Sequence, residues 1–411
     1  MTTTKYNEHK KLNFSSEREQ SQACLNSAEH EKNQGRKVLN VPNLRFPEFQ
    51  GEWKEERLAD IADLYKGTGI SKDQLSDDGE PCILYGELYT KYKSETIREV
   101  ISKTNIDNTK LVRSKANDVI IPCSGETAED IATARCVLNG NILLGGDLNI
   151  IRLHGYDGSF MSYQLNGKRK YDIAKVAQGV SVVHLYGDHL KGVKTYNPCL
   201  EEQKKIAKLL SLIDERISTQ NKIIDKLQSL IKGIRHDIFK DIQGEALALS
   251  NIADIYQPQT ISSSDLTTEG YWVYGANGII GKYKEYNHET EQICITCRGN
   301  TCGTVNYTQP KVWITGNSMV INTDKYQRQV NKRFLFHYLS SYNFKSIVSG
   351  SGQPQIVRTP LEKTKVVLPT IEKQVRIANS IDIVSEKINT ESLVLRLLEN
   401  QKQYLLRQMF I

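Results

Sequence analysis

The stretch Ile206-Ala-Lys-Leu-Leu-Ser-Leu-Ile-Asp-Glu-Arg-Ile217 places apolar side chains at alternating spacings of four and three residues. The same spacing continues to Ile238, and it returns in a second stretch from Ile377 to Met409. This heptad pattern is typical of a long helix that packs against another helix. The predicted seam consists of Ile206, Leu210, Ile213, Ile217, Gln220, Ile224, Leu227, Ile231, Ile234 and Ile238, and of Ile377, Ile381, Val384, Ile388, Glu391, Leu395, Leu398, Lys402, Leu405 and Met409.

Each seam contains a polar residue at the same position of the repeat, Gln220 in the first and Glu391 in the second. A polar seam residue costs stability and can fix the register or orientation of paired helices. The alternative is that this position faces water. Because a long amphipathic helix needs a partner, we expect each helix to pack against the other copy in the same chain.

The rest of the chain is duplicated as well. Leu58-Ala-Asp-Ile-Ala-Asp-Leu-Tyr65 returns as Leu249-Ser-Asn-Ile-Ala-Asp-Ile-Tyr256. The strand-like Val119-Ile-Ile-Pro-Cys123 corresponds to Ile293-Cys-Ile-Thr-Cys297, with Gly125 and Gly299 two positions further on. A constant offset relates Pro198 to Pro369, Gln203 to Gln374, Ile206-Ala207 to Ile377-Ala378 and Phe239 to Phe410. The chain is therefore a tandem repeat of a globular region followed by a helix.

We predict five segments: a weakly ordered tail at 1–40, globular regions at 41–197 and 244–369, and helices at 198–243 and 370–411. Both globular regions contain short β-rich runs such as Asp118–Pro122 and Gln292–Thr296, separated by Gly, Asn and Asp clusters. Each globular region is expected to close with a short helix, Ser159–Val176 in the first and Asn331–Val348 in the second. The expected fold class is α+β.

Composition excludes some classes of protein. The 411 residues carry a net charge of +6, which permits a nucleic-acid partner without requiring one. Eight scattered cysteines form no disulfide framework and suit a reducing cytoplasm. No apolar run reaches the roughly 20 residues of a membrane span, and residues 1–40 lack the apolar core of a secretion signal.

Motifs for catalysis are incomplete. Asn197-Pro-Cys-Leu200 lacks the second proline and the aromatic residue of an amino-methyltransferase tetrapeptide. Gly67-Thr-Gly69 begins a Gly-x-Gly pattern but meets Lys72 where a third glycine is required, so no dinucleotide or phosphate loop is expected. We predict that the chain has no catalytic residues and carries no cofactor.

Two patterns resemble metal sites. Asp188 with Glu202-x-Lys204 fits a loose nuclease pattern, but an acidic residue in the first turn of a helix is expected there because it interacts favourably with the helix dipole. Cys294-x-x-Cys297 with Cys302 and the upstream His288 resembles half a zinc site. Since residues three apart on a strand point to opposite faces, buried thiols are the favoured interpretation, and no metal site is predicted.

Basic and aromatic residues alternate in both globular regions, a pattern that suits DNA. Lysine and arginine attract phosphates, whereas Arg, Asn and Gln can read base edges. A solvated basic face and packed tyrosines remain the alternatives. The candidate DNA-binding residues are Tyr85, Lys91, Tyr92, Lys93, Arg98, Arg113, Lys115, Tyr274, Asn277, Lys282, Tyr283, Arg298, Asn300, Gln353, Gln355 and Arg358.

Three features together resemble a known family. Val41-Pro-Asn-Leu-Arg-Phe-Pro-Glu-Phe-Gln-Gly-Glu-Trp53 leads into the first globular region, Glu201-Glu-Gln-Lys-Lys-Ile-Ala207 and Glu372-Lys-Gln-Val-Arg-Ile-Ala378 begin the helices, and Gly350-Ser-Gly-Gln-Pro-Gln355 closes the second globular region. Residues 41–411 closely resemble the specificity subunits of type I restriction–modification systems. The tail 1–40 lies outside the resemblance.

The resemblance implies two target-recognition domains, each reading one half of a split double-stranded DNA site. The two helices would pack antiparallel as a coiled-coil spacer with pseudo-two-fold symmetry, and would dock two adenine-N6 methyltransferase (M) subunits. Restriction (R) subunits would join the assembly. S-adenosylmethionine, ATP and magnesium would belong to these partners, and the complex would work in the cytoplasm of a bacterium or archaeon.

Two rival hypotheses remain from the residues alone. One is a coiled-coil scaffold with two protein-binding heads, which salt-sensitive binding to duplex DNA would argue against. The other is a metal-dependent nuclease that uses Glu202.

Overall fold

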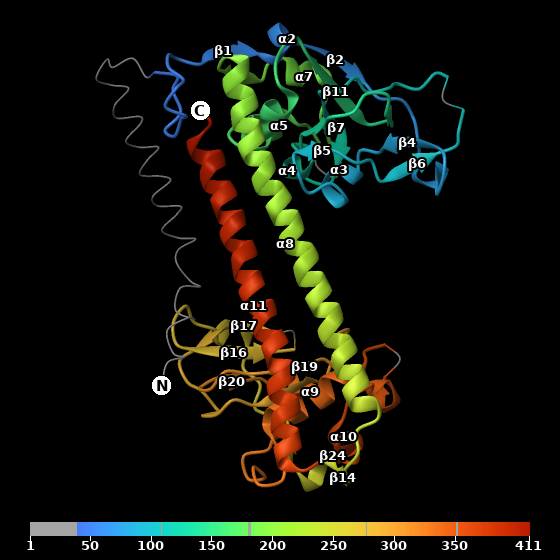
Figure 1. The fold of residues 1–411 in the computed structure, drawn as a ribbon, viewed down its shortest axis with the longest axis vertical. Helices are drawn as coiled ribbons and strands as arrows, with labels where there is room; N and C mark the ends of the chain where they lie inside the picture. The colour runs from blue at the N-terminus through green and yellow to red at the C-terminus, as the bar shows by residue number, and fades with distance from the viewer. Residues whose placement is uncertain (1–38, 108, 180–181, 277, 351) are drawn as a thin grey trace. The chain divides into compact units, whose positions relative to one another are not determined.

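The computed structural model describes residues 39–107, 109–179, 182–276, 278–350 and 352–411. The chain divides into two compact units. Unit 1 holds the residues up to Ile217 together with Leu398–Ile411, and unit 2 holds Ser218–Leu397. The boundary crosses both long helices, α8 (Leu200–Lys240) and α11 (Ile371–Gln408) (Figure 1). The predicted tail falls almost wholly outside the described residues.

The centre of unit 1 is a five-stranded sheet with cores on both faces. Its order is β2 (Ala62–Lys66), β11 (Leu148–Leu153), β7 (Asp118–Pro122), β9 (Arg135–Val137) and β5 (Thr96–Ile97), with only the β5–β9 pair parallel. Successive side chains of a strand point to opposite faces. Val119 and Ile121 accordingly pack with α5 (Gly158–Asn166), whereas Ile120 packs into a separate core.

Smaller elements complete unit 1. A four-stranded sheet has the order β10 (Leu143–Leu144), β4 (Glu80–Ile83), β6 (Ser102–Thr104) and β3 (Leu75–Ser76). Two-stranded pairs join β1 (Lys54–Arg57) to β13 (Lys194–Asn197) and β8 (Ser124–Gly125) to β12 (Val183–His184). The short helices are α2 (Leu58–Ile61), α3 (Glu87–Thr90), α4 (Ala128–Ile131), α6 (Lys170–Val176) and α7 (Gly187–Lys191).

Unit 2 is built in the same way. An antiparallel sheet has the order β15 (Asp254–Tyr256), β21 (Ser318–Asn322), β18 (Ile293–Thr296) and β19 (Val305–Tyr307). A second sheet orders β17 (Gly278–Tyr283), β16 (Tyr271–Gly275) and β20 (Trp313–Ile314). The pairs are β14 (Glu245–Ala248) with β24 (Lys365–Leu368) and β22 (Val348–Ser349) with β23 (Gln355–Ile356), and the helices are α9 (Lys332–Ser341) and α10 (Arg358–Glu362). The predicted α+β class is confirmed.

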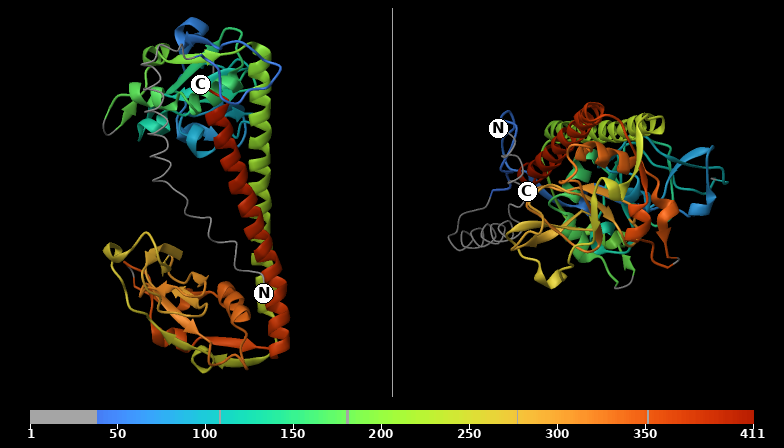
Figure 2. Two further views of the ribbon diagram at one scale, coloured as in Figure 1. Left: turned by 90° about the vertical axis from the view of Figure 1, so that its left-hand side faces the viewer. Right: turned by 90° about the horizontal axis from the view of Figure 1, so that it is seen from below.

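Within each unit one helix lies between the central sheet and a long helix (Figure 2). In unit 1, α5 contacts β7 and β9, and its Phe160 packs against the start of α8. In unit 2, α9 contacts β19, and its Arg333 pairs with Asp382 of α11. The long helices are therefore part of each domain's core.

A duplicated glutamine explains how each of these short helices is held in place. The Oε1 of Gln203 accepts from the backbone nitrogen of Asp157 at 2.9 Å, and its Nε2 donates to the Pro198 carbonyl at 2.8 Å. Gln374 makes the same two bonds, with Asn331 at 2.8 Å and with Pro369 at 2.9 Å. Asp157 and Asn331 are the N-caps of α5 and α9, so each amide ties a domain helix to the chain just before a long helix.

The long helices run antiparallel, as contacts within each unit show. In unit 1, Phe410, just beyond the end of α11, lies 5.2 Å from Phe160 between ring centroids and shares a core with Ile206 at the start of α8. In unit 2, Phe239 near the end of α8 lies 5.6 Å from Phe334 and packs into the core that contains Ala378 of α11. The end of each helix thus packs beside the beginning of the other.

Every predicted seam position is buried or half-buried. Gln220, 8% exposed, donates through Nε2 to the Glu391 carbonyl at 3.0 Å and also to its carboxylate. The two equivalent polar residues therefore meet, and Gln220 does not face water. Equivalent residues of an antiparallel helix pair can meet only near its midpoint, so this bond fixes the register.

A cluster of buried and half-buried polar groups joins the helices to the domain in each unit. In unit 1, Lys402 lies 2.7 Å from Asp214 and 2.5 Å from Glu95, and Tyr163 of α5 donates to Asp214 at 2.7 Å. Burial raises the pKa of Glu95 despite the nearby Lys402. Burial lowers the pKa of Lys402, but Glu95 and Asp214 outweigh that effect and leave it raised. The pairing compensates charges that would be costly to bury alone.

In unit 2, His337 occupies the place that Tyr163 has in unit 1. Its Nδ1 lies 3.0 Å from Arg235 Nη2 and its Nε2 lies 2.8 Å from Asp382 Oδ1. Since arginine only donates and a carboxylate only accepts, the proton is assigned to Nε2 of a neutral ring. Burial opposes ionisation of Asp382, yet hydrogen bonds from His337 and Arg333 lower its pKa to about 2.

The neutral state of His337 predicts that acid destabilises unit 2. Burial lowers its pKa below the usual 6.5, with Arg235 and Arg333 acting in the same direction and Asp382 opposing them. The unfolded chain takes up a proton below about pH 6.5, whereas the folded chain does so only at lower pH. The contribution of neutral His337 to the stability of unit 2 is therefore fully present above about pH 6.5, and it declines as the pH falls towards the pKa of the folded chain.

We expect His337→Gln to weaken this pH dependence, because glutamine keeps one donor and one acceptor but does not titrate. Calorimetric melting between about pH 7.5 and 5 is the measurement. The wild-type Tm for unit 2 should fall more than that of the variant. Equal slopes for both proteins would contradict the assignment.

Candidate nucleic-acid interface

In unit 2, the loop after β18 lies beside the β22–β23 hairpin. Gly299 donates its backbone N–H to Pro354 at 3.0 Å, Ile356 donates to Cys297 at 3.0 Å, and Arg298 forms a β-bridge with Gln355. Four exposed polar side chains come together on this frame. They form the hairpin patch, which consists of Arg298, Asn300, Gln353 and Gln355.

Glycines allow the backbone to turn back on itself here. Gly299 has φ +82° and Gly350 has φ +91°, in the left-handed region that residues with a Cβ rarely adopt. A Cβ at Gly350 would lie 2.4 Å from the Gln353 carbonyl oxygen. The turn that presents Gln353 therefore depends on Gly350.

The side chains of the hairpin patch suit the edges of DNA bases. Arginine can make paired hydrogen bonds to guanine, and asparagine or glutamine can make them to adenine. Among the described residues, Arg298 has no ion-pair partner, so its guanidinium is available to a ligand. Arg358, also predicted, is exposed but pairs with Glu362 at 2.7 Å.

The same backbone frame exists in unit 1. Leu185 donates to Cys123 at 2.8 Å, the counterpart of the Ile356–Cys297 bond, and β12 pairs His184 with Ser124. The residues at this place form the histidine patch, which consists of Ser124, Gln178, His184 and Tyr186. The rings of His184 and Tyr186 stack with centroids 6.2 Å apart.

Sequence reasoning missed the histidine patch. The signal was present, because the sequence already aligns Cys123 with Cys297 and Gly125 with Gly299. Extending that alignment places Ser124 opposite Arg298. Nothing in the sequence, however, shows that the distant residues around His184 pair with this loop.

Two predicted tyrosines do not belong to a DNA-facing surface. Tyr92 is 7% exposed, and its hydroxyl accepts from the Ile101 backbone at 3.2 Å. Tyr274 is 8% exposed and packs in the core with Cys294. Their apolar rings stabilise the domains by burial, which leaves little surface for DNA.

Three predicted basic residues are held by carboxylates. Arg98 lies 2.8 Å from Glu215 and donates to Ser211 of α8 at 2.6 Å, so it anchors the domain to the long helix. Arg113 lies 2.5 Å from Glu80, and Lys91 lies 2.6 Å from Glu87. Contact with DNA phosphates would have to compete with these pairs.

The other predicted residues are spread over the two units. Lys93 and Lys115 are exposed, and Tyr85 is 36% exposed. Lys282 lies 5.0 Å from the centroid of the Trp272 ring, and Tyr283 packs edge-on against Trp313 at 5.0 Å. Asn277 lies outside the described residues.

The nuclease pattern meets a structural obstacle. Glu202 is fully buried, and both its carboxylate oxygens accept from Arg45, at 2.8 and 2.7 Å. A metal ion would have to displace this arginine. The role of Glu202 is to hold the segment before β1 against the start of α8.

The cysteine pattern is explained by packing. Cys294 and Cys297 are buried in different cores, as expected for a strand, and burial raises both thiol pKa values. Within the described ranges, no cluster of three or more His, Cys, Asp and Glu side chains could hold a metal ion. The helices of the described part of the chain include none with the length and apolarity to cross a membrane.

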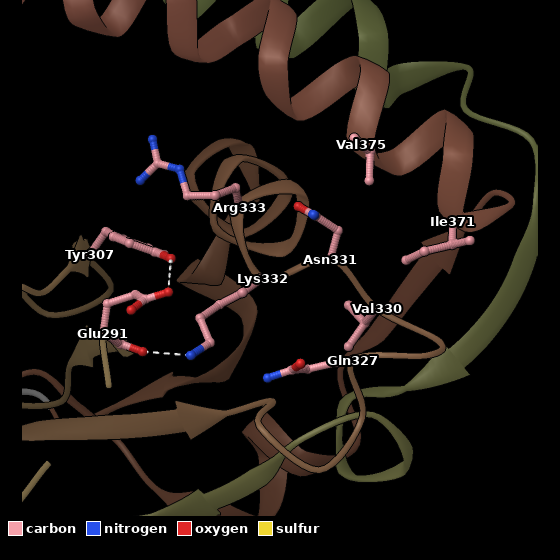
Figure 3. A pocket seen from close by; sticks show the side chains of 9 residues that line it. All are labelled: Glu291, Tyr307, Gln327, Val330, Asn331, Lys332, Arg333, Ile371 and Val375. Carbon is pink, nitrogen blue, oxygen red and sulfur yellow. Dashed lines mark hydrogen bonds between the residues drawn. The ribbon is translucent and has the colours of Figure 1, made fainter. Parts of the chain in front are cut away.

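A hollow of about 380 Å³ lies where α9, β19 and the start of α11 meet in unit 2 (Figure 3). Tyr307 and Lys332 both point towards Glu291, and the apolar Ile371 and Val375 line the other side. Lys332 donates to the Glu291 carbonyl at 2.6 Å and pairs with Asp324 at the same distance. Arg333 is bound to Asp382, so both cations in this wall are already neutralised.

Comparison with known proteins agrees with the duplicated architecture. The family model for the type I restriction modification DNA specificity domain matches twice, at residues 50–229 and 237–399. The MjaVIII type I specificity subunit of Methanocaldococcus jannaschii is 26% identical over 84% of this chain and 88% of its own length. The EcoprrI specificity subunit of Escherichia coli is 28% identical, but over only 34% of this chain and 36% of its own length.

Solved structures share the fold. The crystal structure of a type I restriction-modification S subunit from M. genitalium has a TM-score of 0.64 at 18% identity, covering 90% of this chain and 99% of that one. A chain from a study of complex assembly in the type I system has a TM-score of 0.52 at 15% identity, covering 87% of this chain and 97% of that one. The two matched regions include most of both globular units and both long helices, and the chain therefore belongs to the family of type I restriction modification DNA specificity domains, which it carries as a tandem pair.

Proposed function

We propose that this specificity subunit reads a split double-stranded DNA site, with one half read by each patch and the gap set by the paired helices. Subunits of this kind are non-catalytic. Methylation and cleavage would then reside in partner M and R subunits, which would also bring S-adenosylmethionine, ATP and magnesium.

The observation that carries this proposal is one backbone frame with different side chains in each unit. The Leu185–Cys123 and Ile356–Cys297 bonds place equivalent loops in equivalent positions. The histidine patch presents Ser, Gln, His and Tyr, whereas the hairpin patch presents Arg, Asn and two Gln. A shared frame with unlike hydrogen-bonding groups is expected to read two different half-sequences.

Reading two halves multiplies specificity. Each mismatched base pair costs about 1–3 kcal/mol, roughly additively when the positions are well separated. Two short recognition segments on one chain therefore discriminate more strongly than either alone. This argument favours DNA reading over a scaffold with two protein-binding heads, for which the unlike polar patches have no evident use.

Exposed apolar residues on the long helices support docking of two equivalent partners. Leu212 of α8 is 49% exposed, and its counterpart Ile383 of α11 is 68% exposed. Ile223 and Val394, a second equivalent pair, are each 38% exposed. Exposed apolar side chains that recur at equivalent positions are expected where two copies of one subunit bind.

Arg298→Ala tests the assignment of the hairpin patch. We expect binding to weaken by about 1–3 kcal/mol at sites with the correct second half, because one bidentate base contact is lost. Sequence specificity at the second half-site should become more relaxed, and specificity at the first half-site should not change. Sequencing of methylated DNA checks this, with Arg328→Ala, another exposed arginine of unit 2, as the control. Relaxation of the first half-site instead would contradict the assignment.

A matched heptad insertion tests the helices as the spacer. One heptad is added to α8 just after Gln220 and one to α11 just before Glu391, so that the new seam residues face each other. Each helix lengthens by about 10 Å, which corresponds to about three base pairs. The gap in the methylated motif should grow while both half-sites stay the same. Changed half-sites with an unchanged gap would contradict the proposal.

Substitution of the equivalent apolar pair tests docking. Leu212→Ser and Ile383→Ser should each remove one M subunit, and the double variant should remove both, with little loss of stability because these side chains are exposed. Native mass spectrometry of the purified complex measures the stoichiometry. The matched control is Tyr171→Ser, at a residue 74% exposed on α6 of unit 1. Two M subunits on the double variant would overturn this assignment.

A further inference from the structure

Unit 1 contains a second hollow, and no residue of the hairpin patch or the histidine patch lines it. Its volume of about 850 Å³ lies within the range of about 300–1,000 Å³ that is usual for small-ligand sites. One wall is the loop between β2 and β3, and the other is the segment that follows β4. Gly146 and Asp147, just before β11, complete the lining, so three chain segments of one compact unit form the hollow.

Aromatic and apolar groups make up much of its lining. Tyr85 and Tyr89 lie one helical turn apart along the segment after β4, and Tyr85 is 36% exposed. Ile70 and Leu84 add aliphatic surface. Flat tyrosine rings beside aliphatic groups offer a stacking surface for a planar ligand such as a nucleobase.

One positive charge of the lining is uncompensated. Lys72 is exposed and has no ion-pair partner among the residues that the structure describes. By contrast, Lys91 pairs with Glu87 at 2.6 Å, and Asp147 lies 3.9 Å from Lys66. The site therefore has room for one anionic group at Lys72, unlike the hollow beside α9, where both cations are paired.

Glycines shape the wall that carries Lys72. A Cβ at Gly67 would lie 2.1 Å from the Gly145 carbonyl oxygen, so the loop packs tightly at that point. At Gly69 an added Cβ would meet no atom within 4 Å, so this side of the loop opens into space. Gly67-Thr-Gly69 with Lys72 fails as a dinucleotide motif, yet it places a glycine and a lysine on the wall of a ligand-sized hollow.

The hollow also adjoins the histidine patch. Asp147, on its rim, accepts the backbone N–H of Cys123 at 2.7 Å, and Ser124 of the patch follows directly. A backbone hydrogen bond therefore joins the wall of the hollow to the loop that carries Ser124, within unit 1.

We propose that this hollow binds a nucleotide, with the base against Tyr85 and Tyr89 and the phosphate at Lys72. The Gln74 amide can donate and accept at the base edge. The nucleotide has two possible sources, a free mononucleotide or a base extruded from bound DNA, and only the second rests on the proposed reading of DNA.

The test uses the full chain with two probes. The first probe is the four deoxynucleoside monophosphates, titrated by calorimetry, with the matching deoxynucleosides to measure the phosphate contribution. The second is duplex DNA with 2-aminopurine at successive positions of the target, whose fluorescence rises when the base leaves the stack. Binding of a monophosphate identifies the free source, and a fluorescence rise at one position identifies the extruded source.

Three variants separate the contacts. Tyr85→Ala should weaken the binding of nucleotides and of nucleosides alike by about tenfold or more, because it removes stacking. Lys72→Gln should weaken the binding of the monophosphates about tenfold and leave the binding of nucleosides unchanged. Lys175→Gln on α6 is the charge-matched control. Gly69→Leu should block the hollow without backbone strain, since its Cβ meets only open space.

The proposal is overturned if neither probe responds, or if Gly69→Leu and Tyr85→Ala leave every response unchanged. Unaltered affinity of Gly69→Leu for duplex DNA in that case would show that DNA reading survives while the nucleotide site fails. If the wild-type chain does not bind duplex DNA, the result would instead count against the proposed function.

Discussion

The antiparallel pairing of α8 and α11, in one register, is the constraint on which the rest of the structure depends. Lys402 lies at a seam position of α11, where burial of an unpaired ammonium would cost several kcal/mol. The cost is offset because Asp214 of α8 and Glu95 of the first domain lie within ion-pair distance. A shift by one heptad would separate these charges and also break the Gln220–Glu391 bond. Orientation and register are thus set by polar groups, while apolar burial supplies most of the stability.

This pairing gives each domain a rigid base. The end of one long helix and the start of the other enter each core, and Gln203 or Gln374 fixes the helix that connects core and sheet. The loops that carry the two patches are anchored by strand pairs and by equivalent backbone bonds. Loops on a rigid scaffold can change side chains without changing the frame, which suits a protein whose two halves read different sequences.

The sequence predicted the duplicated layout, the long helices and the α+β class, because heptad spacing and a constant offset are local properties of the chain. It did not predict the ionic clusters, since Glu95, Asp214 and Lys402 are brought together only by tertiary folding. Tertiary folding also explains why some predicted DNA-binding residues lie outside the two patches. Tyr92 lies in a run of basic and aromatic residues that suits DNA, but its side chain is buried. Arg98, in the same region, is held by Glu215. The sequence does not single out His184, because its partner Ser124 is far away in sequence.

The most direct test of the central claim maps methylated adenines in the DNA of cells that carry this wild-type chain with an M partner, against cells that lack the chain. A tandem pair of unlike readers on paired helices predicts one motif with two different specific halves and a non-specific gap of fixed length. A single continuous motif, or two halves with a variable gap, would contradict the account.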